Sequence, residues 1–341
     1  MKTCLAFVLA ASVAGCASMQ PSGSQTAGSP TLVVLNKSEQ SASLIDPATG
    51  QTLAKLPVGR GPHELVVAPD GRTAYVANFG RFGVYPAGDT SHTQAGNTIT
   101  VLDLAARSVK ATHAFGTHTG QHGFAISRDG RHVWVTSETP NALLELDGAT
   151  GKILNVWQTD QERSHLVVAA PDEKKFYVTN TVSGSVSVID RASGGVKVIP
   201  VGAGAEGITI SPDGREVWVA WRTDSKISVI STATDAIVET FAAGGEGPQR
   251  VQFTPDGTEV WTSNVRNNTV TVFDARTRKL LSTISVGKAP GGIVFSPDGR
   301  RGYFALSGAN QVAVIDVQAR KVIQTFATGV EPDGIAWAVM R

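Results

Sequence analysis

The chain has 341 residues and an almost balanced charge, with 30 Lys and Arg against 29 Asp and Glu and a formal net charge of +1. This balance excludes the strongly basic surface of a nucleic-acid-binding protein and the acidic composition of a disordered chain. The only two cysteines, Cys4 and Cys16, both precede residue 17, which excludes a disulfide framework and a cysteine-rich metal site.

The N-terminal sequence predicts that the protein is located in the bacterial cell envelope. Lys2 precedes an apolar run from Leu5 to Val13, as in a secretory signal peptide that is too short to span a bilayer. The segment Val13-Ala14-Gly15-Cys16 resembles the lipobox of bacterial lipoproteins, and the resemblance implies that Cys16 becomes the lipidated first residue. We therefore expect a signal peptide at 1–15 and a lipidated Cys16 with a flexible tether at 16–30, at the periplasmic or outer-membrane face. An ordinary secretory signal is the alternative.

Residues 31–341 are predicted to form one β-propeller because a turn motif recurs along them. The motif is mostly Pro-Asp-Gly, and its Asp residues are Asp70, Asp129, Asp172, Asp213, Asp256 and Asp298. Their spacings of 59, 43, 41, 43 and 42 residues give a period of about 42, with an insertion at roughly Gly80 to Gly96 in the first interval. Each repeat holds four short runs rich in β-branched and aromatic residues, which is typical of a propeller blade.

One repeat carries a recognisable signature. Phe176-Tyr177-Val178-Thr179-Asn180, followed by Val186-Ser187-Val188-Ile189-Asp190, resembles the YVTN-type β-propeller repeat of the lactonase and cytochrome-d1-like propellers. Related segments are Tyr75–Asn78, Trp134–Ser137 and Trp261–Asn264. The resemblance implies the fold, but the family includes binding proteins, lactonases, lyases and cofactor-assembly proteins, so it leaves the activity open.

The strand pattern predicts an all-β, seven-bladed propeller. Six complete four-strand sets start near residues 63, 122, 165, 206, 249 and 291. Residues 32–58 supply three further strands and residues 333–339 supply one. We expect these three N-terminal strands and one C-terminal strand to form the seventh blade, which closes the ring and removes its free sheet edges.

The start of each innermost strand is expected to lie at the mouth of the central channel. Around the ring this position is occupied by His63, His122, His165, Glu206, Gln249, Gly291 and Asp333. The insertion with His92 and the connector with His118 are expected on the same face. His113 and His132 are excluded, because they fall in an outer strand and near the opposite turn.

Three interpretations of this mouth remain open. His63, His122, His165 and Glu206 are a ligand set for a divalent transition metal such as Zn, Cu, Ni or Fe. Alternatively, His122 or His165 acts as a base without metal while Arg250 holds an anion. In the third interpretation these side chains are hydrogen-bonded around a water-filled channel and have no ligand.

The predicted function is metal, small-ligand or partner binding at the mouth of an envelope-anchored propeller. The alternatives are a lactonase-like hydrolase or lyase and a non-catalytic scaffold, so whether the protein is an enzyme stays open. Additional candidate ligand-binding residues are Glu64, His92, His118, Gln249, Asp333, Trp221 and Arg222. We expect a monomer held to the membrane by lipid on Cys16, with a small ligand or an envelope protein at the mouth and no nucleic acid.

Overall fold

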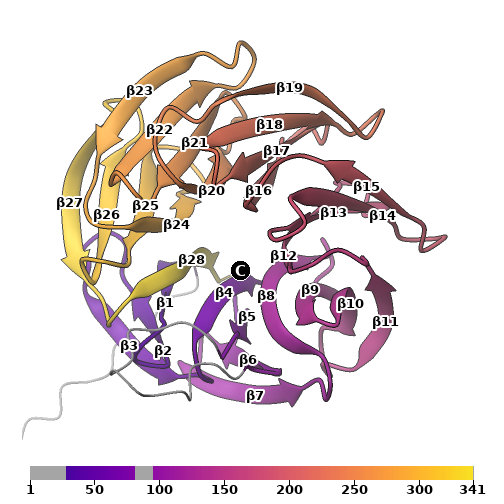
Figure 1. Cartoon of the computed structure of the whole chain (residues 1–341). Coiled ribbons are helices and arrows are strands. Elements are labelled where there is room, and N and C mark those ends of the chain that lie inside the picture. The colour runs from indigo at the N-terminus through magenta and orange to yellow at the C-terminus, as the bar shows by residue number, and fades with distance from the viewer. Residues whose placement is uncertain (1–27, 81–94, 341) are drawn as a thin grey trace, which may run out of the picture.

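The computed structural model describes residues 28–80 and 95–340, which form a ring of seven four-stranded antiparallel sheets around a central channel (Figure 1). The expected signal peptide, Cys16 and His92 lie outside the described residues. In the part of the chain that is described, no helix is long and apolar enough to cross a membrane.

Each blade runs from an innermost strand A, which lines the channel, to an outermost strand D. The A strands are β4 (Pro62–Val67), β8 (Thr119–Ile126), β12 (Ser164–Ala169), β16 (Ala205–Ile210), β20 (Pro248–Phe253), β24 (Pro290–Phe295) and β28 (Pro332–Val339). The B strands are β1 (Pro30–Asn36), β5 (Thr73–Asn78), β9 (His132–Thr139), β13 (Lys175–Asn180), β17 (Glu216–Trp221), β21 (Glu259–Asn264) and β25 (Arg301–Leu306).

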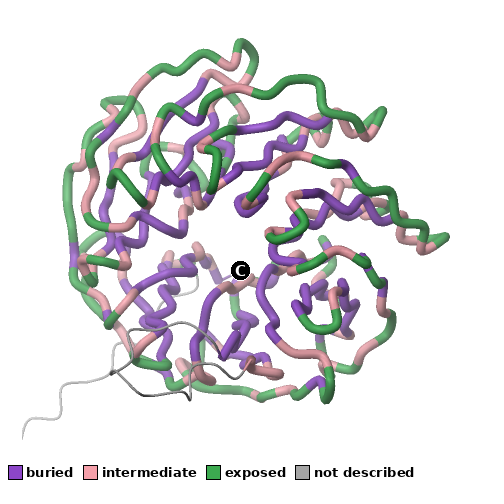
Figure 2. Tube along the Cα trace, in the orientation of Figure 1, coloured by how far each residue is buried: buried purple, intermediate pink, exposed green. Residues whose placement is uncertain are grey.

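The outer half of each blade consists of strands C and D. The C strands are β2 (Ser41–Ile45), β6 (Thr98–Asp103), β10 (Asn141–Asp147), β14 (Ser185–Asp190), β18 (Lys226–Ser231), β22 (Thr269–Asp274) and β26 (Gln311–Asp316). The D strands are β3 (Thr52–Pro57), β7 (Ser108–Ala114), β11 (Ile153–Gln158), β15 (Val196–Pro200), β19 (Ala236–Ala242), β23 (Leu280–Ser285) and β27 (Lys321–Ala327). Strands B and C are buried between blades, whereas the D strands are largely exposed (Figure 2).

The predicted closure is confirmed. The last sheet has the order β28-β1-β2-β3, so one C-terminal strand joins three N-terminal strands. In register, Val34 pairs with Ile335 on one side and with Ser43 on the other. This antiparallel pairing leaves no open edge between the first and last repeats, which is why the ring is continuous.

The Asn that ends strand B in the repeat motif is a buried structural amide. The amide of Asn180 donates hydrogen bonds to the hydroxyls of Ser185 (3.1 Å) and Ser187 (2.9 Å) on strand C. In another blade, Asn78 Oδ1 accepts a bond of 3.0 Å from the backbone N–H of Gly59, in the connector that precedes strand A. The motif therefore anchors the loops that lead to the mouth of the channel.

The tryptophans of strand B pack between blades. Trp134, Trp218 and Trp261 are fully buried. The guanidinium of Arg191, from the next blade, lies 5.0 Å above the Trp134 ring, and that of Arg278 lies 5.8 Å above Trp218. These cation–π contacts join neighbouring blades. The three indoles occupy the same position in their B strands, as expected for residues that pack between blades.

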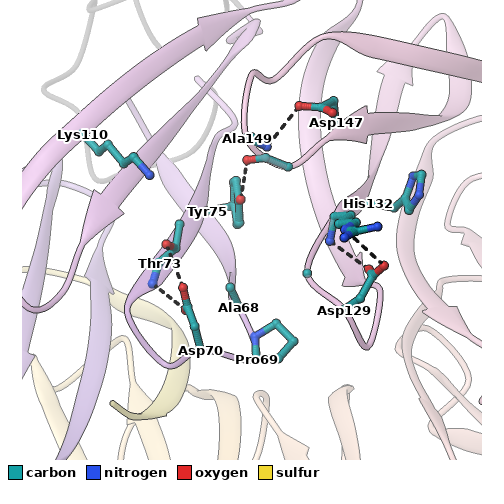
Figure 3. Close-up of a pocket in the computed structure, with 13 residues that line it drawn as sticks. Ala68, Pro69, Asp70, Thr73, Tyr75, Lys110, Asp129, His132, Asp147 and Ala149 are labelled. Carbon is teal, nitrogen blue, oxygen red and sulfur yellow. Dashed lines mark hydrogen bonds and ion pairs between the residues drawn. The ribbon is translucent and has the colours of Figure 1, made fainter. Parts of the chain in front are cut away.

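Several hollows lie between blades on the face that carries the Pro-Asp-Gly turns. Figure 3 shows one of about 510 Å³, with Tyr75 and His132 in its wall. Its acidic side chains bond their own turns: Asp70 accepts from the N–H of Arg72 at 2.7 Å, and Asp129 accepts from that of Arg131 at 3.0 Å. Similar hollows recur between other blades, so they follow from the repeat geometry.

Candidate functional site

Two of the mouth residues, His165 and Glu206, are positioned by the threonine of the repeat motif. In the third blade around the ring, the Thr136 hydroxyl accepts a bond from the N–H of Gly123 (2.9 Å) and donates one to the carbonyl of His165 in the next blade (2.6 Å). The hydroxyl of Thr179 reaches the carbonyl of Glu206 in the same way, at 3.0 Å. Each threonine hydroxyl therefore holds the A strand of its own blade against the A strand of the next blade. In this way it fixes the backbone position of the next mouth residue.

Glycines that follow the mouth residues let neighbouring A strands approach closely. A Cβ built on Gly123 would stand 2.5 Å from the Cα of Leu166, and one on Gly334 would stand 2.5 Å from the carbonyl oxygen of His63. Real Cβ atoms do not make such short contacts, so only Gly fits these positions. The result is a narrow channel in which mouth side chains of consecutive blades touch.

Three histidines of three consecutive blades form a stack at the mouth. The ring centroid of His122 lies 4.1 Å from that of His63 and 3.7 Å from that of His165. Phe79 closes one side of the stack, with its ring centroid 5.1 Å from that of His122. The side chain of His122 is 0 % exposed, and neither of its ring nitrogens has a hydrogen-bond partner within the described chain.

Carboxylates lie beside the two outer imidazoles. Oδ2 of Asp333 is 2.6 Å from Nδ1 of His63, and it is also 3.3 Å from the ammonium of Lys37. At the other end, Nδ1 of His165 is hydrogen-bonded to Oε1 of Glu138 at 3.2 Å, which leaves Nε2 of His165 buried and without a partner in the described residues. Each outer imidazole therefore has one nitrogen beside a carboxylate.

The electrostatics of the mouth follow from burial and from these neighbours. Burial lowers the pKa of His122 well below its usual value, and the nearby His165, His63, Arg250 and Lys37 lower it further. Burial of Asp333 would raise its pKa, but its interactions with His63 and Lys37 hold that pKa well below the ordinary range. The central ring, His122, is thus a neutral imidazole, while the Asp333 carboxylate beside His63 stays ionised.

A buried ion-pair chain lies on the other side of the mouth. The Arg250 guanidinium is hydrogen-bonded to Glu64 and lies 3.6 Å from Glu206, measured from Nη1 to Oε1. Arg222 Nη1 approaches the other oxygen of Glu206 at 3.3 Å. Burial alone would lower the pKa of Arg250, but the surrounding carboxylates raise it above its usual value, so the guanidinium stays charged.

One group of side chains at the mouth is close enough together to hold a metal ion. His63, Glu64 and His122 each offer one ligand atom, and the three atoms lie within 4.8 Å of one another. His165 stacks on His122 beside this group, whereas Glu206 is paired with Arg222 and Arg250. The carboxylate in this group is Glu64, which is also hydrogen-bonded to Arg250, and not the Glu206 expected from the sequence.

The other candidates have different surroundings. Trp221 is buried and packs in the core, with the ammonium of Lys226 5.7 Å from its ring centroid. The carbonyl of Gln249 accepts a bond of 3.1 Å from Arg250, and the carbonyl of His118 accepts one of 2.9 Å from Gln121. Burial lowers the pKa of His118. His92 lies outside the described residues.

Sequence reasoning missed three residues of the mouth, Lys37, Phe79 and Glu138. Lys37 and Phe79 directly follow the last residue of their B strands, and Glu138 is the second-last residue of β9. An alignment of the repeats would have revealed them, because each directly follows the last residue of the repeat motif. The aligned pairs are Asn36-Lys37, Asn78-Phe79 and Ser137-Glu138, and their second members form a second ring of mouth residues. Phe79 also bonds Gly96 across the insertion, its carbonyl accepting from the Gly96 N–H at 2.7 Å.

Below the mouth, the channel holds a cavity of about 200 Å³. Its upper wall includes Glu64 and Arg250, and its other walls are mostly apolar, with Phe124, Leu166, Ile208, Ile293 and Ile335. The volume is enough for a few water molecules or for part of a small organic ligand.

The fold and this mouth define a closed seven-bladed β-propeller with a histidine and carboxylate cluster on its axis. Residues 167–301 match a family model described as a YNCE-like beta-propeller. A search of curated proteins gave no match. The recognition of YVTN-type propeller repeats, made from the sequence motifs, is thereby confirmed.

Solved structures of similar shape support the same fold. A functionally unknown protein from Desulfotomaculum acetoxidans is 13% identical, with a TM-score of 0.76 over 91% of this chain and 99% of that chain. The periplasmic gluconolactonase of Pseudomonas aeruginosa is 21% identical, with a TM-score of 0.73 over 92% and 99%. A putative 6-phosphogluconolactonase from Bacteroides fragilis is 13% identical, with a TM-score of 0.71 over 91% and 98%. At these identities the likeness shows the propeller fold and lactonase-like structural neighbours.

Proposed function

We propose that the protein binds one divalent transition-metal ion at the channel mouth, through His63, Glu64 and His122. The observation that carries the proposal is His122, whose imidazole is fully buried with both nitrogens unpartnered in the described chain. Leaving a buried polar group unpaired costs about 1–3 kcal/mol, so such a group calls for a ligand. An ion within reach of a neighbouring imidazole and carboxylate satisfies it.

The donor set fits Zn, Cu, Ni or Fe(II). Imidazole nitrogens with one carboxylate oxygen are ligands that these ions accept, and three protein ligands leave a coordination position open. Nε2 of His165 is a fourth nitrogen beside the set, because its ring stacks on His122 and this atom has no partner in the described residues. A bound ion would supply Lewis-acid chemistry or a site for a small ligand above the cavity.

The test is metal content and metal affinity on residues 17–341, purified without a metal-affinity tag. We expect one equivalent of metal by mass spectrometry, or stoichiometric uptake of added Zn, and loss of uptake in His63→Ala/His122→Ala. His132→Ala is the matched control, because His132 also lies beside a carboxylate, Glu145 at 3.0 Å, but on the opposite face. Failure to bind Zn, Cu, Ni and Fe(II) would refute the proposal.

A second candidate is a metal-free, lactonase-like hydrolase or a lyase. It is favoured by the His165–Glu138 hydrogen bond, which is the arrangement of an oriented general base with a free Nε2, and by the lactonase-like structural neighbours. Under this proposal His122 also takes part, and Arg250 steadies an anion. Turnover of gluconolactone that resists chelators and is lost in His165→Ala would favour the enzyme, whereas chelator-sensitive turnover would assign the chemistry to the metal.

We also propose that lipid on Cys16 anchors the protein in the cell envelope. The first strand begins at Pro30, which pairs with Val339, and Val339 lies against Gly71 of a Pro-Asp-Gly turn. The tether therefore joins the turn face, so the mouth would point away from the membrane toward small ligands or envelope proteins. Radiolabelled palmitate should label the wild type and not Cys16→Ser. Equal labelling of the two would refute the anchor.

A further inference from the structure

The proton positions on the two outer imidazoles follow from their neighbours. His63 Nδ1 and Asp333 Oδ2 lie 2.6 Å apart, which is closer than two unprotonated acceptor atoms approach. A proton therefore lies between them, and the nitrogen carries it because Asp333 stays ionised. The same holds for His165, whose Nδ1 is hydrogen-bonded to the Glu138 carboxylate, a group that only accepts when ionised.

We infer that Asp333 and Glu138 are positioning residues that hold the protons of His63 and His165 on Nδ1 and so present the Nε2 lone pairs of both rings on either side of His122. This inference rests on the proposed metal site for its function. A carboxylate behind a ligating imidazole fixes the tautomer and makes the ligand more basic. Neither residue contacts the ion; each acts through the ring that it holds.

Each positioning carboxylate is itself fixed by a cation from another part of the fold. Lys37, in the turn after β1, reaches Oδ2 of Asp333, which is the same oxygen that faces His63. Arg163 Nε lies 3.7 Å from Oε2 of Glu138, which is the oxygen that does not face His165. This difference in attachment makes the two carboxylates respond differently to replacement by an amide.

In Asp333→Asn, the Lys37 ammonium can only donate, so it keeps the amide oxygen at the shared position. His63 then retains its Nδ1 proton. In Glu138→Gln, Arg163 draws the amide oxygen to its own side and turns the amide NH₂ toward His165. Nδ1 of His165 must then accept, and its proton moves to Nε2. The conservative variant therefore preserves one tautomer and reverses the other.

The experiment reads the tautomers directly by long-range ¹H–¹⁵N NMR of histidine-labelled protein at pH 8, in the presence of a chelator. We expect Nδ1–H for both rings in the wild type, retention at His63 in Asp333→Asn and a switch to Nε2–H at His165 in Glu138→Gln. Nε2–H at either ring in the wild type would overturn the inference for that residue. A switch in Asp333→Asn without one in Glu138→Gln would overturn the argument about the cations.

A second readout uses the metal. We expect about 10- to 100-fold weaker Zn affinity in Asp333→Ala, with recovery of most of the affinity in Asp333→Asn, as for other residues that orient a metal ligand. The control is Glu145→Gln, which alters the carboxylate beside His132 far from the mouth and should leave Zn affinity unchanged. Equal affinity in all three variants would overturn the positioning role. Because the NMR measurement needs no metal, failure of the metal site and failure of the tautomer assignment are separable.

Discussion

Acid should destabilise this protein through His122, and replacing that residue by Phe should remove the effect. His122 is 0 % exposed and its pKa is lowered well below 6.5, first by burial and then by the neighbouring His165, His63, Arg250 and Lys37. The unfolded chain takes up a proton on this residue below about pH 6.5, whereas the folded chain does not. The free energy of unfolding therefore falls as the pH falls.

The size of the effect follows from linkage. One proton bound only by the unfolded chain changes the free energy of unfolding by about 1.4 kcal/mol per pH unit. Between pH 8 and 4.5 the contribution of a folded His122 that stays neutral is therefore about 2.7 kcal/mol. The Phe ring fills a similar space between His63 and His165 and carries no proton.

The assay is urea unfolding of the metal-free chain from residue 17, followed by tryptophan fluorescence at half-unit steps between pH 4.5 and 8. Asp, Glu and the other His residues titrate in both proteins, so the difference between wild type and His122→Phe isolates His122. We expect the wild type to lose stability relative to the variant below pH 6.5. Parallel curves would show that the ring takes up its proton in the folded state, and the account of its burial would be wrong.

Two further predictions concern how the mouth is built. Gly123→Ala should cost about 1–3 kcal/mol of stability and lower the affinity of the mouth for Zn, because the new Cβ meets the Leu166 backbone. Calorimetry would measure the stability, and titration with Zn would measure the affinity. An unchanged melting temperature would contradict the close approach of the strands. Asn180→Ala should lower the free energy of unfolding by about 2 kcal/mol, since it leaves two buried hydroxyls without a donor. The control, Asn155→Ala on the exposed strand β11, should leave the stability unchanged. Equal effects of the two substitutions in urea unfolding would contradict the structural role of the motif.

Much of the mouth was foreseeable because the fold is a repeat. Once the period placed the starts of the A strands on one axis, His63, His122 and His165 had to meet, and the structure brings their rings into contact. The pairing of carboxylates was not foreseeable in the same way. Glu64 and Glu206 are both beside the channel, and only the tertiary structure shows that Arg250 contacts both carboxylates while Arg222 contacts Glu206.

The sequence by itself determined the fold and the identity of the ring residues, because a period of about 42 and the turn motif are local properties of the chain. Even the closure by β28 followed from counting strands. Only the tertiary structure decided which polar groups touch. Lys37 and Asp333 are almost three hundred residues apart, and they meet because the ring closes there. Distances of a few ångströms between side chains of different blades depend on how closely the A strands pack, which glycine positions such as Gly334 permit and no single repeat reveals.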